Sequence, residues 1–141
     1  LIREKSYVNR IKKWSKQVKN KAEKIIESTL LLKKKNYKIE FRFIGKNATL
    51  GSLESKRVKP HEIGVLVIVT TKKQDACEEI GKILNPLLLH HSIYDNRELP
   101  TFSFPLSPPS FNIGKKYEFC LNHVIGIKNP MDIFKLEKYS L

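Results

Sequence analysis

Residues 102–125 have the sequence FSFPLSPPSFNIGKKYEFCLNHVI, which joins two unlike halves. The first half contains Pro105, Pro108 and Pro109. Each proline fixes φ and removes a backbone donor, so this half cannot form a helix or a central strand. In the second half, residues 117–125, the two faces of an extended chain differ in character, which predicts a β-strand. One face carries Tyr117, Phe119, Leu121, His123 and Ile125, and the other carries Glu118, Cys120, Asn122 and Val124.

The loop half carries four large apolar side chains, which are Phe102, Phe104, Leu106 and Phe111. A small domain rarely leaves so much apolar surface in water. We therefore predict that these side chains bind a partner, as an ordered patch over residues 100–114 that docks on a second copy or on a larger chain. The alternative interpretation is that all four fold inward against the strand at residues 117–125.

Upstream of this stretch, the apolar periodicity predicts one long helix and two strands. Residues 6–28 have apolar side chains at helical spacing and lysines on the opposite face, with Ser6 as the expected N-cap. Residues 37–43 alternate between apolar and charged, which is typical of a strand with one wet face. Residues 63–69, IGVLVIV, are almost wholly apolar, so we predict a central strand covered on both faces.

A second helix is predicted after these strands, ending at His90 and His91. Thr71 and Gln74 have the spacing of a capping box at its start. Pro86 predicts a kink or a restart within it. Residues 101–104 alternate enough to form a short edge strand, and residues 131–141 are expected to form a packed C-terminal turn.

The order of these elements is helix, strand, strand, helix, loop, strand, tail. Helices and strands do not alternate strictly, which favours an α+β fold with a small antiparallel or mixed sheet covered by two helices. The length of 141 residues fits a single domain, residues 1–141. The chain begins with Leu1 rather than Met, so we expect a processed chain or a piece of a longer polypeptide.

Composition narrows the class of protein further. No run of about 18 apolar residues occurs, so no membrane span is predicted. Cys77 and Cys120 lie far apart and lack metal-ligand spacing, so we expect reduced, buried thiols in a cytoplasmic protein. No glycine-rich loop precedes a helix in the form that binds phosphate, so no nucleotide cofactor is expected.

The formal net charge of +13 raises the question of nucleic-acid binding, because a basic surface attracts phosphate without sequence specificity. Most of the excess is lysine spread along the chain, whereas arginine is the better fork for phosphates and bases. We interpret the charge as a solvated basic surface. The alternative hypothesis is a small basic nucleic-acid-binding domain, and the binding expected from charge alone is weak and nonspecific.

The residue types that carry catalysis are present without a recognised pattern. Weak catalytic candidates are His61, Glu62, His90, Ser107 and His123. A histidine beside a carboxylate forms an acid–base or metal site only if the fold adds a further ligand, and no spacing demands this. The other interpretations are a helix-capping role for His90, a hydrogen-bonded core position for His123 and a turn for Ser107. We predict no metal site.

Several blocks within residues 61–134 keep a distinctive order and spacing. They are His61-Glu62-Ile63-Gly64-Val65, Leu88-Leu89-His90, Phe104-Pro105-Leu106-Ser107-Pro108, Gly114 before Tyr117-Glu118-Phe119, Asn122-His123-Val124, and Asn129-Pro130 with Ile133-Phe134. In these blocks the chain resembles the C-terminal part of the acyclic terpene utilisation (AtuA-type) family. The Phe-Pro-x-Ser-Pro block is the most specific of them. Family members usually have Ala-Gly-Asn just before that block, where this chain has Leu99-Pro100-Thr101.

The resemblance implies a link to bacterial degradation of acyclic terpenes, such as citronellol and geraniol, through CoA thioesters. The large glycine-rich N-terminal portion of the family, which is the expected place of the chemistry, is not in this sequence. The resemblance therefore implies a C-terminal domain or companion subunit that acts through assembly or as a lid rather than as a complete catalyst. Its expected partner is a second copy or a larger N-terminal AtuA-like subunit.

Overall fold

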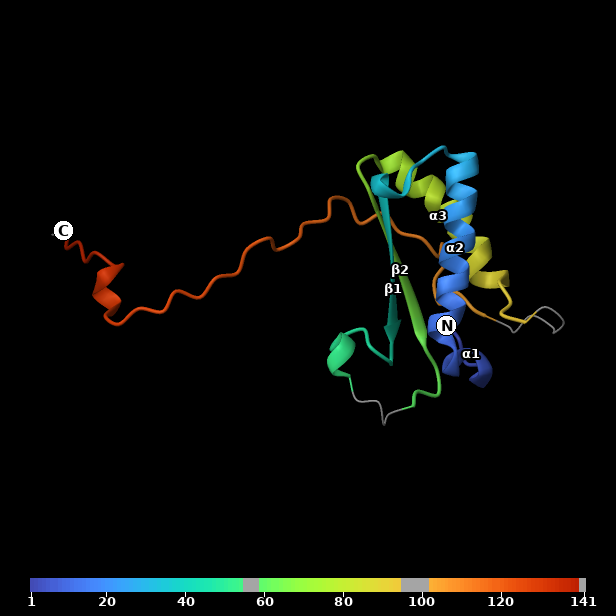
Figure 1. Ribbon diagram of the computed structural model, residues 1–141, viewed down its shortest axis with the longest axis horizontal. Helices are drawn as coiled ribbons and strands as arrows, with labels where there is room; N and C mark the ends of the chain where they lie inside the picture. The colour runs from blue at the N-terminus through green and yellow to red at the C-terminus, as the bar shows by residue number, and fades with distance from the viewer. Residues whose placement is uncertain (55–58, 95–101, 140–141) are drawn as a thin grey trace.

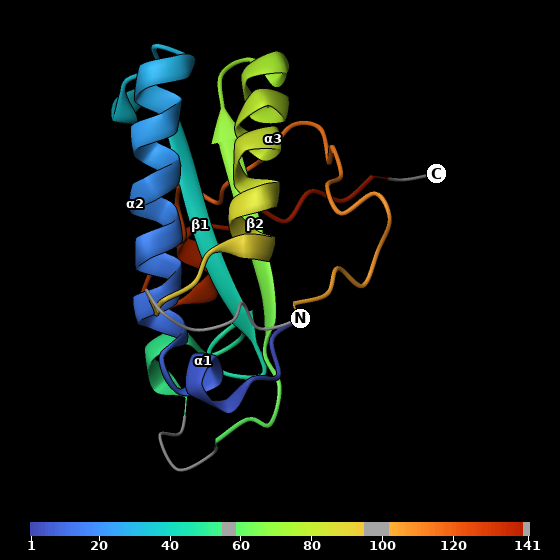
Figure 2. The same ribbon diagram turned by 90° about the vertical axis from the view of Figure 1, so that its right-hand side faces the viewer.

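The fold is a two-stranded antiparallel sheet with helices on one face. The computed structural model describes residues 1–54, 59–94 and 102–139. The elements are α1 (Lys5–Asn9), α2 (Ile11–Thr29), β1 (Tyr37–Ile44), β2 (Gly64–Thr71) and α3 (Gln74–His90). Figure 2 shows α2 and α3 side by side in front of β1 and β2, with α1 below them. The predicted α+β class, with helices covering a small sheet, is confirmed.

The helical stretch predicted over residues 6–28 is divided at Arg10. The backbone N–H of Arg10 donates to the carbonyl of Tyr7 and ends α1, and α2 begins at the next residue. The predicted N-cap at Ser6 is wrong. Glu4 caps α1, because its side chain accepts a hydrogen bond from the Ser6 N–H at 3.0 Å. The helical spacing is confirmed, since α2 buries Ile11, Trp14, Val18, Ala22 and Ile26.

The strands β1 and β2 pair in a register that separates a covered face from an uncovered one. Opposite each other in the ladder are Ile39 and Val69, Phe41 and Val67, and Phe43 and Val65. These side chains pack with the helices as the core of the fold. The other face, called the uncovered face below, carries Lys38, Glu40, Arg42 and Ile44 from β1 and Gly64, Leu66, Ile68 and Thr70 from β2.

The predicted central position of β2, covered on both faces, is wrong. Among the described residues β2 has only β1 as a strand neighbour, and Leu66 on the uncovered face is 46% exposed. The strand predicted at residues 117–125 does not join this sheet, so β1 is the single strand neighbour of β2 among the described residues.

Helix α3 differs from expectation at its start and at Pro86. It begins at Gln74 with Lys73 as N-cap, so the predicted capping box does not form. Thr71 instead accepts a hydrogen bond from the Lys73 N–H at 3.2 Å, which closes a local turn before the helix. The helix also continues through Pro86 to His90, so of the predicted kink or restart there, the restart is wrong, and the kink stays a prediction.

The C-terminal part of the chain is extended rather than folded onto the sheet. Residues 104–129 contain neither helix nor strand, and Figure 1 shows this part leading away from the sheet. The strand predicted at residues 117–125 is therefore absent from this single chain. A strand requires a neighbour for its backbone hydrogen bonds, and this stretch has none alongside it.

Two further predictions concern the ends of this part of the chain. The expected packed C-terminal turn is wrong, because residues 131–139 are exposed beside a single 3-10 turn. Of the edge strand predicted at residues 101–104, Thr101 lies outside the described residues. The Ser103 N–H does donate to the carbonyl of Leu1 at 3.4 Å.

Candidate interaction surface

Phe102 fixes the start of the C-terminal part in the helical layer. Its side chain is 8% exposed and meets the ring of Tyr7 edge to face, with ring centres 5.1 Å apart. It makes a similar contact with Trp14 at 5.6 Å. Trp14 is held in turn, because its indole N–H donates to the His91 carbonyl at 2.9 Å. Of the four side chains predicted to bind a partner, Phe102 thus lies in the core.

The other three side chains predicted to bind a partner lie at the surface. Phe104, Leu106 and Phe111 are all exposed. One hydrogen bond at 3.1 Å, from the hydroxyl of Ser110 to the side-chain oxygen of Asn85, ties this loop to α3. The neighbouring Leu99-Pro100-Thr101, where the chain departs from the AtuA-type pattern, lies outside the described residues.

An ionic cluster holds the chain to the uncovered face of the sheet farther along. The Lys116 ammonium lies 3.0 Å from a carboxylate oxygen of Glu40 in β1 and 3.0 Å from one of Glu118. Lys38 lies 3.3 Å from Glu40 and 4.0 Å from Glu118. The hydrogen bond from Lys116 is the main reason that the pKa of each carboxyl lies below its ordinary value. Such exposed pairs contribute little energy singly, but together they fix a position.

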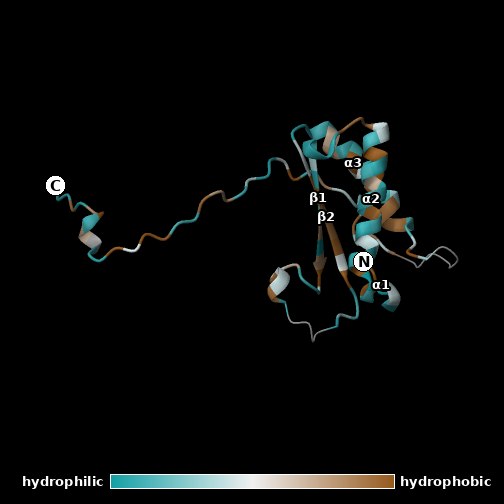
Figure 3. Ribbon diagram, in the orientation of Figure 1, coloured by the Kyte–Doolittle hydropathy of each residue, from teal (hydrophilic) through white to brown (hydrophobic). Residues whose placement is uncertain are grey.

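Beyond this cluster, residues 117–136 present apolar side chains to water; this stretch is called the exposed segment below. Phe119 is 88% exposed. The other large apolar residues exposed in it are Tyr117, Leu121, Val124, Ile125, Ile127, Met131, Ile133, Phe134 and Leu136. Figure 3 shows hydrophobic stretches recurring along it. Apolar surface on this scale marks a site of interaction with another protein or a membrane.

The predicted catalytic residues lie on separate parts of the chain. His61 and Glu62 are exposed before β2, and His90 is exposed at the end of α3. Ser107 is exposed in the proline-rich loop. His123 belongs to the exposed segment and lies at the surface, so it does not have the core position considered for it from the sequence. Within the described part of the chain, no three His, Cys, Asp or Glu side chains are grouped as they would be around a metal ion.

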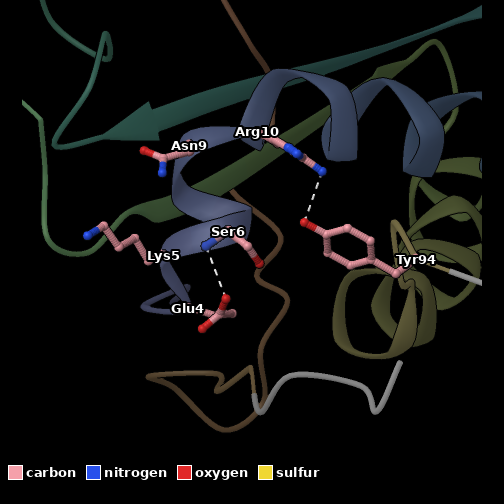
Figure 4. Close-up of a pocket in the computed structure, with 6 residues that line it drawn as sticks. All are labelled: Glu4, Lys5, Ser6, Asn9, Arg10 and Tyr94. Atoms are coloured by element: carbon pink, nitrogen blue, oxygen red, sulfur yellow. Dashed lines mark hydrogen bonds between the residues drawn. The ribbon is translucent and has the colours of Figure 1, made fainter. Parts of the chain in front are cut away.

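A surface hollow of about 400 Å³ lies between α1 and the residues after α3, and Figure 4 shows the residues that line it. It is lined by Glu4, Lys5, Ser6, Asn9, Arg10 and Tyr94. Arg10 donates to the Tyr94 hydroxyl at 3.0 Å and lies 5.6 Å from the centre of its ring. These contacts join α1 to the chain after α3. None of the predicted catalytic residues lines this hollow, so we assign it a structural role.

His91 was not among the residues predicted from the sequence to bind or react. Burial, and to a lesser extent the nearby positive charge of Lys21, lowers the pKa of its imidazole. Its Nε2 atom is buried and has no hydrogen-bond partner among the described residues. His91 therefore favours the neutral form, and no other titratable side chain completes an acid–base pair with it among the interactions described.

The two cysteines are free thiols, and they differ in exposure. Cys77 is partly buried, and its sulfur lies 3.7 Å from the Val69 carbonyl. Cys120 is exposed in the exposed segment, so the expectation that both thiols are buried is wrong for Cys120. No helix in the described part of the chain is long and apolar enough to cross a membrane.

No family model, no curated protein and no solved structure matches this chain. The resemblance to the AtuA-type family therefore stays a prediction that rests on the sequence blocks alone.

Proposed function

We propose that this chain is an assembly module, either the C-terminal domain or a companion subunit of an AtuA-type protein. It acts by binding another chain rather than as a complete catalyst. The observation that carries the proposal is the exposed segment, in which residues such as Phe119 and Leu121 stand in water. The connection to acyclic terpene and acyl-CoA catabolism rests on the sequence resemblance.

Burial of this segment supplies the driving force for binding. Fully burying one large apolar side chain is worth about 1.5 to 3 kcal/mol. The segment contains many such side chains, and the Lys116 cluster already fixes the point where it leaves the sheet. A chain anchored in this way loses less freedom on binding than a free peptide does.

The arrangement of polar residues supports a role without independent catalysis. The histidines His61, His90 and His123 come from three different parts of the chain, and all three are exposed. Acid–base catalysis requires a base within hydrogen-bond reach of the group that it deprotonates, and of a residue that orients it. None of the hydrogen bonds described joins one of these three histidine side chains to a serine, threonine or cysteine.

The proposal is tested by light scattering after size exclusion, with the purified chain alone and mixed with an AtuA-type N-terminal polypeptide. We expect association in at least one of these samples. The double substitution Phe119→Ser, Leu121→Ser should abolish it and keep the circular dichroism of the fold. The matched control, Cys120→Ser with Asn122→Ser, changes the opposite face of the same stretch and should associate as the parent does.

Two results would overturn the proposal. One is a parent chain that is monomeric in both samples up to about 100 µM, well above the range of specific interfaces. The other is turnover of a terpenoyl-CoA ester by the purified chain that His123→Ala abolishes, since that makes the chain a catalyst in its own right.

Nucleic-acid binding is the second candidate, and the exposed face of α2 favours it. Five lysines on this face are exposed, namely Lys12, Lys13, Lys16, Lys21 and Lys24. They form a positive strip that attracts phosphate by charge. The aromatic rings of Tyr7, Trp14 and Phe102 are buried, so they are not available to stack on bases in the way that sheet-type RNA-binding domains use aromatics.

A further inference from the structure

The two edges of the sheet differ in how well they are protected. On β1, the Lys19 ammonium donates to the Ile39 carbonyl at 3.0 Å, which places a charged side chain across the free edge. Lysine at an edge is a common protection against pairing with another strand. The β1 edge is therefore the less available of the two.

Among the described residues, the hydrogen bonds to the outer edge of β2 lie near its two ends. Just before β2, Ile63 exchanges two backbone hydrogen bonds of 2.9 Å with Ile2. Because backbone groups alternate in direction along a strand, those of Val65, Val67 and Val69 point the same way as those of Ile63. The Val69 carbonyl meets the Cys77 sulfur at 3.7 Å. Between these points, no hydrogen bond described reaches the outward groups of Val65 and Val67.

The exposed segment does not lie beside a strand edge of its own sheet. Lys116 and Glu118 contact Lys38 and Glu40, whose side chains project from the uncovered face of β1. A paired strand has to lie beside an edge, about 4.8 Å from its neighbour in the plane of the sheet. From its anchor over the face, the segment leads away from the sheet, as Figure 1 shows.

We propose that residues 117–125 pair as a strand with the outer edge of β2 in a second copy of this chain, and that two copies exchange this segment reciprocally. The inference rests on the proposed assembly role and adds the identity of the partner. Each copy offers one unpaired strand sequence and one open edge, so two copies satisfy each other in a closed twofold arrangement.

The area available is compatible with a stable dimer. An aromatic side chain buries about 150 to 250 Å², so Tyr117 and Phe119 of two copies supply about 600 to 1,000 Å². A standard interface buries about 1,200 to 2,000 Å² in total, and Leu121, Ile125 and Leu66 are exposed and available to supply the remainder.

Charge also permits a second copy of this strongly basic chain to approach. Across residues 117–127 the one side chain charged at neutral pH is the carboxylate of Glu118. The strand offered to the partner therefore adds no positive charge to the contact, and like-charge repulsion at the pairing edge is avoided.

The alternation of residues 117–125 determines which face of the new strand lies on the helix side of the partner sheet and which lies on its uncovered face. The face with Tyr117, Phe119 and Leu121 belongs on the helix side, beside Val65 and Val67 of the partner sheet. The opposite face, which carries Cys120, then lies on the same side as Leu66. A cysteine placed at Leu66 of one copy should therefore come within reach of Cys120 of the other.

The test is a disulfide between two differently tagged preparations, both carrying Cys77→Ser. One also carries Leu66→Cys and Cys120→Ser, and the other keeps Cys120. Leu66 is exposed, so its substitution leaves the core intact. After mixing and mild oxidation we expect a disulfide-linked heterodimer at least about 10-fold more abundant than with Lys13→Cys, an exposed control site on α2.

Three results would overturn the proposal. The first is a full chain that is monomeric in sizing and forms no more crosslink at Leu66→Cys than at Lys13→Cys. The second is an intramolecular disulfide when Leu66→Cys and Cys120 are in one chain, because that places the segment on its own sheet. The third is association only with the N-terminal AtuA-type polypeptide, which removes the second copy as partner but leaves the assembly role standing.

Discussion

The ammonium of Lys116 lies 3.0 Å from the carboxylate of Glu40, although the two residues are 76 positions apart in the chain. Glu40 lies in the middle of β1, so this contact brings the C-terminal part of the chain back over the uncovered face of the sheet. Glu118 and Lys38 complete an alternating arrangement of two lysines and two carboxylates. The exposed segment leaves the fold from this point.

Removing Lys116 should raise the pKa of Glu40 toward its ordinary value. The hydrogen bond from Lys116 is the largest cause of the lowered pKa, and the one from Lys38 is smaller. An NMR pH titration of the Glu40 carboxyl should therefore show a clear upward shift in Lys116→Ala and a lesser one in Lys38→Ala. An unchanged titration in Lys116→Ala would show that the anchor does not form in solution.

The same cluster makes the anchor sensitive to acid. The pKa values of Glu40 and Glu118 are lower in the folded chain than in the unfolded one. Their contribution to the stability of the anchor is therefore complete above the ordinary carboxyl pKa. It is lost as the pH falls through the lowered values. We expect a spin label at Cys120 to move away from the sheet over that pH range. At high salt the label should move away at a higher pH, because salt screens exposed ion pairs.

Phe102→Ala should destabilise the fold far more than Phe111→Ala, which removes an exposed aromatic ring. Phe102 is buried against Tyr7 and Trp14, and removing a buried Phe side chain costs about 3 to 5 kcal/mol. Phe111 is exposed, so Phe111→Ala should cost less than about 1 kcal/mol. Urea unfolding followed by tryptophan fluorescence measures both. Equal effects of the two substitutions would mean that Phe102 does not pack in the core.

The parts of the fold that were predictable from the sequence are those with a local cause. Apolar spacing in α2 and strict alternation in β1 both report which side of the element is buried, so both elements were predicted. The bounds of β1 agree to within one residue, whereas the helix predicted over residues 6–28 is divided into α1 and α2 at Arg10. The errors at Ser6 and Thr71 also have a local cause. Both residue types are good helix caps, but the N-caps lie two residues away, at Glu4 and Lys73, where other local hydrogen bonds form.

The course of the C-terminal part was not predictable in this way. An alternating stretch reports that one face is to be buried, but not whether the sheet that buries it belongs to the same chain. Residues 117–125 were predicted as a strand of this domain, and β2 was predicted as a central strand covered on both faces. In this chain the two lie apart, and the proposed exchange of residues 117–125 between two copies would bring them together.

His91 should make the fold less stable in mild acid. Its pKa is lower in the folded chain than the ordinary value of 6.5, so the unfolded chain takes up the proton first and stability falls as the pH drops below about 6.5. Because the group is partly exposed, the effect is small. His91→Gln should flatten the change in urea midpoint between about pH 7.5 and 5.5, whereas His90→Gln, at an exposed position, should not. An identical pH dependence in His91→Gln and the parent would contradict this assignment.

Nucleic-acid binding should be weak and governed by salt. Lysines that contact phosphate release counterions, so affinity for any duplex should fall steeply between about 50 and 200 mM salt. Replacing Lys12, Lys13 and Lys16 on α2 by Gln should weaken binding equally for all sequences. It should also reduce the salt slope by about one for each lysine that no longer neutralises a phosphate.

The control replaces Lys128 and Lys135 in the exposed segment, which removes positive charge outside the α2 strip. Fluorescence anisotropy with two unrelated duplexes measures these changes. A submicromolar Kd that persists at about 200 mM salt with a preference for one sequence would instead favour a dedicated nucleic-acid-binding domain, because charge alone gives neither property.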